Sequence, residues 1–314
     1  MTDLVVTRLR VSWLCEGAVR LPPYPGSMVR GLLGHGLKRA VCVMRRDACD
    51  GCVLESNCIY ARFFEAPARD PLARKRFAHV PPPYVLEFPK PTPRALPGRG
   101  VFTFHLHFLA PPREFLPYLV VAMEKAGELG MGRPRTRFRL TAIDQETALG
   151  SGRWQAVYRP GQPLDPGPVT ALGQAPRRPP RRLAVHLETP LRLKRRGQLI
   201  RPETFTLSGF LGAVRSRLDD LAWLYAGAPA VSRPFSTVPV DETRLRQARL
   251  RWLDWGRYSS RQRQEMKLGG LVGRLEVDGE ALDEHWPALW LGQWLHAGKQ
   301  TSMGLGQYRL EVLS

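Results

Sequence analysis

The sequence lacks the long apolar runs and the leader segment that would place it in or across a membrane. No stretch of 18 or more apolar residues occurs, so no transmembrane helix is expected. The first residues, MTDLVVTRLRVSW, lack the basic region and apolar core of a secretory signal and instead alternate like a strand. We therefore expect a cytoplasmic protein.

A nucleotide-binding P-loop is also missing. The segment His296–Val312, HAGKQTSMGLGQYRLEV, contains a Gly-Lys pair and further glycines. However, Gln293 and Gln300 stand where a P-loop needs a glycine and a Ser or Thr. The segment also precedes a final strand instead of opening a helix, so a nucleoside triphosphatase is disfavoured.

Acidic residues are scarce, with 28 against 47 basic residues in 314, which gives a formal charge of +19. Basic residues concentrate in Arg177–Arg182 and Arg192–Arg201. Arginine enrichment in a GC-rich genome would not explain this clustering, and no basic amphipathic helix points to a membrane surface. Nucleic acid is therefore the leading partner, because phosphates attract such a charge by counterion release.

Two similar halves flank a proline-rich segment, Arg159–Arg182. RGLLGHGLKRA (Arg30–Ala40) aligns without gaps with SGFLGAVRSRL (Ser208–Leu218), and each half ends in Gly-x-Gly and a strand-like run. We predict an N-terminal domain over 1–158, with a cysteine-rich insertion around 42–90. A linker over 159–182 and a C-terminal domain over 183–314 follow.

The order of hydrophobic patterns in each half is strand, helix, strands, helix, glycine loop, strand. This order predicts an α+β protein of two tandem ferredoxin-like (RRM-like, βαββαβ) domains. The clearest expected elements are strands over Leu4–Leu14, Val101–Leu109, Leu183–Leu193, Ala248–Trp255 and Leu271–Val277, and helices over Glu114–Gly127 and Ala281–Gly298.

Several segments together resemble the RAMP superfamily of CRISPR-associated proteins, and within it the endoribonucleases that process CRISPR precursor RNA. The Tyr-Ser-Ser-Arg-Gln run together with the C-terminal glycine loop is the most specific part. The matching segments are PGSMVRGLLGHGLKRAVC (Pro25–Cys42), CIYARFFE (Cys58–Glu65), PPPYVLEFP (Pro81–Pro89), RYSSRQRQEMKLGGLVG (Arg257–Gly273) and HAGKQTSMGLGQYRL (His296–Leu310).

The resemblance implies a metal-independent endoribonuclease that cuts each CRISPR repeat at the base of its stem-loop and keeps the product guide RNA. The nucleophile would be the adjacent 2′-hydroxyl, and a 2′,3′-cyclic phosphate would be left. The alternative is a non-catalytic RNA-binding subunit of a CRISPR effector complex, since one fold serves both roles. A general RNA chaperone is less consistent with these segments.

Family enzymes place a histidine near the first helix, which implies a catalytic role for His35, with Lys38 and Tyr24 beside it. His35 and Lys38 are three residues apart and share a helix face. His35 would act as the base, Lys38 would stabilise charge, and Tyr24 would orient or donate. Alternatively His35 packs between two glycines, and His296, just before the glycine loop, is the rival catalyst or a helix-end residue.

The RNA-binding expectation rests on two groups of residues. The glycine loop would let RNA phosphates approach backbone N–H groups, and a basic turn would bind the phosphates of the stem. The alternatives without RNA are that the loop is only a tight turn and that the basic turn is only solvated charge. The predicted RNA-binding residues are Arg192, Lys194, Arg195, Arg196, Arg201, Arg261, Gly298, Lys299, Thr301, Ser302, Gly304 and Gly306. His105 and His107 lie on a strand face that we expect to be solvated.

Four of the five cysteines, Cys42, Cys49, Cys52 and Cys58, fall within one short segment. A tight four-cysteine cluster in a cytosolic protein is more often a metal site than a disulfide pair, and four thiolates suit structural zinc. An iron–sulfur cluster is the alternative. Cys15 is expected to be a plain core residue, and no catalytic metal is expected.

Overall fold

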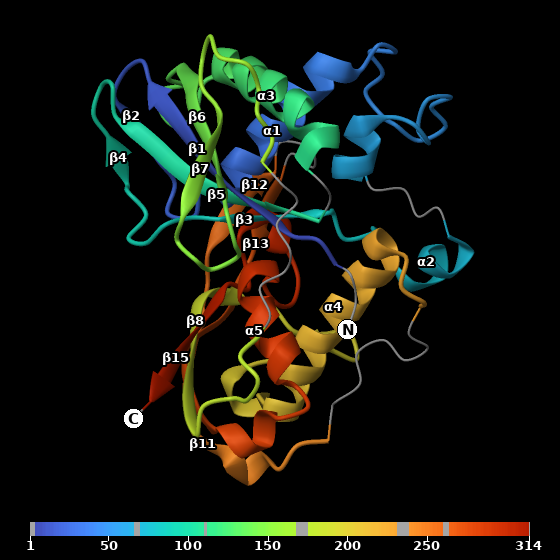
Figure 1. Ribbon diagram of the computed structural model, residues 1–314, viewed down its shortest axis with the longest axis vertical. Coiled ribbons are helices and arrows are strands. Elements are labelled where there is room, and N and C mark those ends of the chain that lie inside the picture. Colours follow the sequence, from blue (N-terminus) through green and yellow to red (C-terminus); the bar gives the residue numbers. More distant parts are fainter. Residues whose placement is uncertain are drawn as a thin grey trace. The chain divides into compact units, whose positions relative to one another are not determined.

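The computed structural model describes residues 4–65, 70–109, 112–167, 175–230, 239–259 and 264–313. The chain divides into two compact units, an N-terminal unit over Leu4–Leu172 and a C-terminal unit over Gly173–Ser314. Each unit has its own hydrophobic core and its own sheet with helices (Figure 1). Among the described residues, no helix has the length and apolar character needed to cross a membrane.

The N-terminal unit is a ferredoxin-like fold with one extra edge strand. Its sheet is antiparallel, in the order β3-β5-β1-β6-β7, so the first four strands take the 2-3-1-4 arrangement of a βαββαβ unit. Its main elements are β1 (Thr7–Cys15), α1 (Gly26–Val41), β3 (Tyr84–Glu87), β5 (Val101–Phe108), α3 (Pro112–Leu129), β6 (Phe138–Glu146) and β7 (Trp154–Tyr158). Smaller elements are β2 (Val19–Arg20), the π-helix η1 (Ala61–Glu65), α2 (Pro71–Arg76) and β4 (Ala95–Leu96).

Alternation along β1 produces the core of this unit. Leu9, Val11 and Trp13 are buried on the face that α1 and α3 cover, and Trp13 stacks on Phe138 at 4.2 Å between ring centroids. The two helices pack closely because α1 carries Gly36, where a Cβ atom would lie 2.0 Å from a carbonyl oxygen of α3. The helix–helix contact therefore depends on a glycine beside His35.

The C-terminal unit repeats the fold with the sheet order β11-β14-β8-β15, again 2-3-1-4. Helices α4 and α5 cover one face (Figure 1). The main elements are β8 (Arg182–Leu191), α4 (Leu207–Ala226), β11 (Leu245–Leu253), β14 (Gly270–Asp278), α5 (Trp286–Leu295) and β15 (Tyr308–Leu313). The described part of this unit also contains two hairpins, β9 (Lys194–Arg195) with β10 (Gln198–Leu199) and β12 (Gly256–Ser259) with β13 (Gln264–Lys267). Its 3-10 turns are η2 (Pro202–Thr204), η3 (Glu242–Arg244), η4 (Gly279–Leu282) and η5 (Thr301–Met303).

Local chemistry fixes the ends of α4, the longest helix of this unit. The Thr206 side chain accepts a hydrogen bond from the N–H of Gly209, and the Glu242 carboxylate accepts from the N–H groups of Leu207 and Ser208. Gly227 ends the helix in a left-handed conformation, at φ 71°. The tandem ferredoxin-like fold expected from the sequence is thus confirmed.

The described parts of the proline-rich segment are largely exposed, but a few of their residues contact the folded units. Arg159 forms an ion pair with Asp144 at 2.6 Å, and Leu164 packs on the N-terminal core. Farther along, the carbonyl oxygen of Pro176 accepts a hydrogen bond from the Trp286 indole. The boundary between the units, at residues 172 and 173, falls within the linker expected over 159–182.

Of the two histidines of β5, His107 is fully buried and His105 is largely covered, so the expectation of a solvated strand face was wrong. The Glu87 carboxylate lies 3.2 Å from His105 Nδ1 and 2.9 Å from His107 Nε2, and it also pairs with Arg8 at 2.8 Å. Trp154 covers the network, stacking on His105 at 5.3 Å between centroids. Sequence alternation identified the face but could not show that these charges pair with one another there.

This network gives a prediction about acid stability. Burial lowers the pKa of His105, and the charge of Arg8 lowers it further against the opposing pull of Glu87. Burial alone would raise the pKa of Glu87, but hydrogen bonds from His105 and His107 hold it well below its ordinary value. For both groups the unfolded chain binds protons first as pH falls, so stability should decrease from about pH 6.5 for His105 and below about pH 4.3 for Glu87.

We expect His105→Asn to flatten the decline of the unfolding free energy between about pH 7 and pH 5, because it removes the titrating group. Urea denaturation at each pH measures this, and His79→Asn, at an exposed position, is the control that keeps the wild-type slope. An unchanged slope in His105→Asn would show that another group dominates.

Candidate nucleic-acid interface

The C-terminal glycine loop is a compact turn docked on the end of β8. A Cβ atom at Gly298 would lie 2.5 Å from the carbonyl oxygen of Arg192, and one at Gly306 would lie 1.8 Å from that of Ala297. Both glycines have positive φ, at 76° and 72°. Only glycine fits these close approaches, so the loop conformation requires glycine at both positions.

Much of the loop's hydrogen-bonding capacity is used within the protein. The N–H of Lys299 donates to Arg192 O at 3.0 Å, and the N–H of Gly306 donates to Pro190 O at 3.2 Å. The side chains of Thr301 and Ser302 lie in the buried η5 turn, with exposed fractions of 5% and 7%. Lys299 is exposed. A phosphate reaching this loop would therefore meet Lys299 at the surface, whereas both hydroxyls lie beneath it.

Arg192 joins three segments at this end of the sheet. Its backbone oxygen receives Lys299 N–H, and its guanidinium donates to the carbonyl oxygen of Gly269, just before β14. Burial lowers the pKa of this arginine. Arg192 thus links the glycine loop, through its backbone, to the start of β14, through its side chain, a role that the charge pattern alone did not reveal.

The β9–β10 hairpin presents the exposed positive charges predicted from the sequence. Lys194, Arg195 and Arg196 are all exposed. Arg196 and Gly197 form the two-residue turn with φ of 50° and 83°, which is the left-handed pair that a tight hairpin needs. The buried Ile200 anchors the hairpin base through a hydrogen bond from its N–H to Leu193 O at 2.9 Å.

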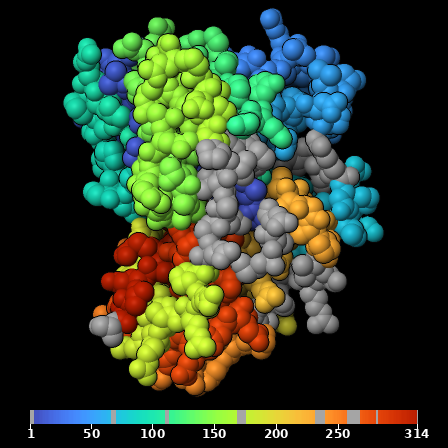
Figure 2. Space-filling view, viewed as in Figure 1, coloured from blue at the N-terminus to red at the C-terminus, as the bar shows by residue number. Residues whose placement is uncertain are grey.

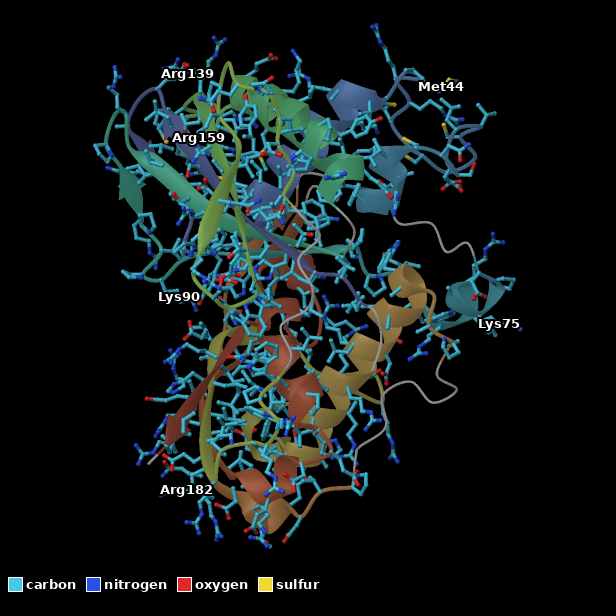
Figure 3. The ribbon with its side chains drawn as sticks, viewed as in Figure 1. Met44, Lys75, Lys90, Arg139, Arg159 and Arg182 are labelled. Carbon is cyan, nitrogen blue, oxygen red and sulfur yellow. The ribbon has the colours of Figure 1, made fainter. Side chains whose placement is uncertain are left out.

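Arg201 follows the hairpin and lies over an aromatic ring. Its guanidinium carbon is 3.6 Å from the ring centroid of Trp252 on β11, and the Trp252 indole N–H donates to Asp254 Oδ1 at 2.7 Å. The hairpin, the glycine loop and this pair all belong to the end of the second sheet where β8 and β11 finish. Arg182, labelled in Figure 3, marks the opposite end. Arg261, the remaining predicted RNA-binding residue, lies outside the described residues.

His296 is a buried part of the glycine loop. Only 1% of it is exposed, its φ is 56°, and Nδ1 lies 3.1 Å from the carbonyl oxygen of Leu305. An RNA phosphodiester could reach its ring only if the loop opened. This placement favours the reading in which His296 supports the helix end and the loop.

His35 lies on the exposed face of α1. Its neighbours Gly34 and Gly36 face inward, against Phe64 and α3, so His35 is not packed between them. One turn earlier, nothing lies within 4 Å of a Cβ atom built at Gly31. The helix surface beside the imidazole is therefore open to a ligand, as a catalytic side chain requires.

Lys38 and Tyr24 are less free than His35. Lys38 Nζ donates to the carbonyl oxygen of Asp47 at 2.7 Å and lies 5.4 Å from the centre of the Tyr60 ring. It therefore contacts the cysteine-rich segment. Tyr24 is half-buried in the turn before α1. These residues belong to the N-terminal unit, and the glycine loop belongs to the C-terminal unit.

The four clustered cysteines line one cavity at the edge of the N-terminal unit. They are half-buried free thiols, and Met44 in the same segment is labelled in Figure 3. Burial raises the pKa of the Cys49 thiol, Glu65 adds to this, and Lys38 opposes it. Across the described ranges, no group of three or more His, Cys, Asp or Glu side chains is placed to hold a metal ion. The thiols share a cavity but are not assembled as a ligand set.

Two family models match the chain, one over each unit. The N-terminal domain family AF_1859_N matches residues 4–170, more than half of the chain. The family of the CRISPR-associated endoribonuclease Cas6 matches residues 185–308, which include the basic hairpin and the glycine loop. The resemblance to CRISPR-associated RAMP endoribonucleases that the sequence indicated is thereby confirmed.

Individual relatives are distant in sequence. A curated protein from Archaeoglobus fulgidus, described only as uncharacterized, is 28% identical over 129 residues, which are 41% of this chain and 43% of that protein. A Cas6-RT-Cas1–Cas2 complex matches with a TM-score of 0.53 at 12% identity, covering 99% of this chain and 29% of that one. Thermus thermophilus Cas6 matches with a TM-score of 0.50 at 14% identity, covering 98% and 99%. These structures share the fold, and this chain spans less than half the length of the first two relatives.

Proposed function

We propose that this chain, which belongs to the AF_1859_N family and matches the Cas6 endoribonuclease family over its C-terminal unit, cuts CRISPR precursor RNA within each repeat. The observation that carries the proposal is the basic end of the second sheet, which lies within the Cas6-matched region. There Lys194, Arg195 and Arg196 are exposed on one hairpin and Lys299 on the adjoining loop. A net charge of +19 supports a polyanionic substrate.

The proposed reaction needs no nucleophile from the protein. The RNA 2′-hydroxyl loses its proton to a base and attacks the adjacent phosphorus, and the bond to the 5′-oxygen breaks. A 2′,3′-cyclic phosphate and a 5′-hydroxyl end result once an acid protonates the leaving oxygen. An exposed imidazole on a rigid helix suits the base, and His35 occupies such a position. Lysine or arginine charge would stabilise the phosphorane.

The positions of the exposed charges support the proposal that the guide RNA is retained. Phosphate contacts at the basic hairpin and Lys299 would hold the repeat stem, and cutting one bond beside the stem removes none of them. Product would therefore stay bound after cleavage, and turnover would be limited by release.

The experiment that tests this function maps RNA ends. Purified protein is incubated with the repeat RNA of its own genome in EDTA, and we expect one cut per repeat, leaving a 2′,3′-cyclic phosphate. A repeat with a single 2′-deoxy nucleotide at the cut site should remain intact. A requirement for Mg²⁺, or cleavage of the deoxy substrate, would overturn the mechanism.

An RNA-binding subunit of a CRISPR effector complex is the second candidate. One structural neighbour is a Cas6 joined to other CRISPR proteins in a complex, and the same basic surface would serve a non-catalytic subunit. Tight binding of repeat RNA without any cleavage would favour this role.

We also propose that Cys42, Cys49, Cys52 and Cys58 hold a structural zinc ion. The donor chemistry fits a tetrahedral thiolate site, and all four residues line one cavity. Their placement here does not assemble the set, so binding requires this segment to close around the metal. Zinc would stabilise the segment and take no part in the reaction.

Elemental analysis of protein prepared without chelators should find about one zinc per chain. Cys49→Ser with Cys52→Ser should lose the metal and lower the melting temperature, whereas Cys15→Ser, in the β1 core, should keep it. Iron in place of zinc would indicate a cluster. Finding neither metal would refute the site.

A further inference from the structure

The Arg201 guanidinium lies over the Trp252 ring and forms the outer, exposed layer of the pair. The guanidinium lies 3.6 Å from the Trp252 ring centroid, which is contact distance for two flat groups. Trp252 is half-buried, while Arg201 is exposed. Among the described residues, no carboxylate pairs with Arg201. The ring is therefore the partner that fixes the plane of the guanidinium, and the opposite face of that plane is available.

The ring beneath Arg201 is held in one orientation. Its indole N–H donates to Asp254 Oδ1 at 2.7 Å. Gly269 lies so near that a Cβ atom there would be 2.6 Å from Trp252 Nε1. The carbonyl of Gly269 in turn receives the Arg192 guanidinium. A planar group resting on this ring is thus pre-oriented, which lowers the ordering cost of adding a further layer.

The backbone of Arg201 is held as well. Its N–H donates to Thr204 Oγ1 at 3.1 Å in the η2 turn, and the preceding residue, Ile200, is buried in the core. The pair stands beside two positively charged segments, because Arg201 directly follows the basic hairpin and Arg192 connects Gly269 to the loop that carries Lys299. Phosphates bound by those segments would bring the RNA chain past the stack.

We propose that the Arg201–Trp252 pair is a stacking platform for one unpaired nucleobase of the bound RNA. This rests on the proposed RNA-binding function and replaces the role of Arg201 as a phosphate contact. Guanidinium planes stack on bases as aromatic rings do, and such contacts tolerate any base because every base has a π-face. The platform would fix which nucleotide leaves the stem, without reading its identity.

The test distinguishes a role for the flat guanidinium group of Arg201 from a role for its positive charge. Arg201→Lys keeps the charge but loses the flat group, so affinity for repeat RNA should fall about tenfold while the slope of log K against log salt stays unchanged. Arg246→Lys is the matched control. Arg246 is exposed at the other end of β11, pairs with Asp278, and should bind as the wild type does.

RNA substrates with a single abasic site at each unpaired position in turn identify the stacked base. An abasic site at one of these positions should lower the affinity of the wild type about tenfold. The same RNA should bind Arg201→Lys no more weakly than the intact RNA does. Trp252→Phe should bind better than Trp252→Ala, with melting temperatures recorded for both. Equal losses in both proteins at every position, full affinity of Arg201→Lys, or a reduced salt slope in it would overturn the platform. If the platform proposal fails in this way but the wild type still binds and cuts repeat RNA, the proposed function stands. If the wild type binds no repeat RNA, the platform and the proposed function are both wrong.

Discussion

His35→Ala is expected to slow cleavage of repeat RNA by roughly 10²–10⁴-fold and to change its affinity by less than about twofold. The imidazole is exposed on α1, so its loss removes no core contact. A base acts mainly in the transition state, which is why rate and affinity should separate. Single-turnover cleavage and filter binding on one RNA measure the two effects.

The control is another exposed histidine, His79, whose alanine variant should cut at the wild-type rate. His296→Ala gives the contrast, because a buried side chain that contacts Leu305 should affect activity through stability. Its melting temperature and its cleavage rate should therefore fall together. If His35→Ala cuts at full rate while a stably folded His296→Ala is inactive, the base belongs to the glycine loop. If both cut normally, the enzyme uses neither histidine.

Periodicity predicted the fold because strands such as β1 alternate between buried and half-buried residues and the long helices bury one face. The strand expected over Val101–Leu109 matches β5 almost residue for residue. The helix expected over Ala281–Gly298 is shorter, because Gly279–Leu282 forms a 3-10 turn and His296 leaves helical geometry. Ends of helices depend on caps and single φ values, which a hydrophobic pattern does not encode.

For the candidate site, the sequence predicted the exposed charged residues but not the contacts that hold the site together. The hairpin charges were found because exposure is the default for clustered lysine and arginine. The structural roles of Arg192 and of the two buried hydroxyls were missed, since a long-range contact such as Arg192 to Gly269 has no signature in sequence. The Arg201–Trp252 pair was missed for the same reason: the residues are far apart in the chain.

Gly306→Ala is expected to destabilise the C-terminal unit by roughly 2–5 kcal/mol and to abolish tight RNA binding. The left-handed φ of 72° alone costs an alanine about 1–2 kcal/mol. The added Cβ atom would also sit 1.8 Å from the carbonyl oxygen of Ala297, so the backbone must move, which typically costs a further 1–3 kcal/mol or so. That movement would break the hydrogen bond from Ala297 N–H to Gly306 O.

Gly161→Ala measures the first contribution, the left-handed φ, without the second. Gly161 has nearly the same φ, 76°, but nothing lies within 4 Å of its Cβ position, so only the conformational cost should appear. Lys299→Ala removes one exposed charge and should weaken RNA binding mildly, lowering the salt slope by somewhat under one unit. If the loop matters as a shaped surface, Gly306→Ala must therefore impair RNA binding far more than Lys299→Ala. Equal effects of the two variants on affinity would mean that the loop contributes its charge and not its backbone shape.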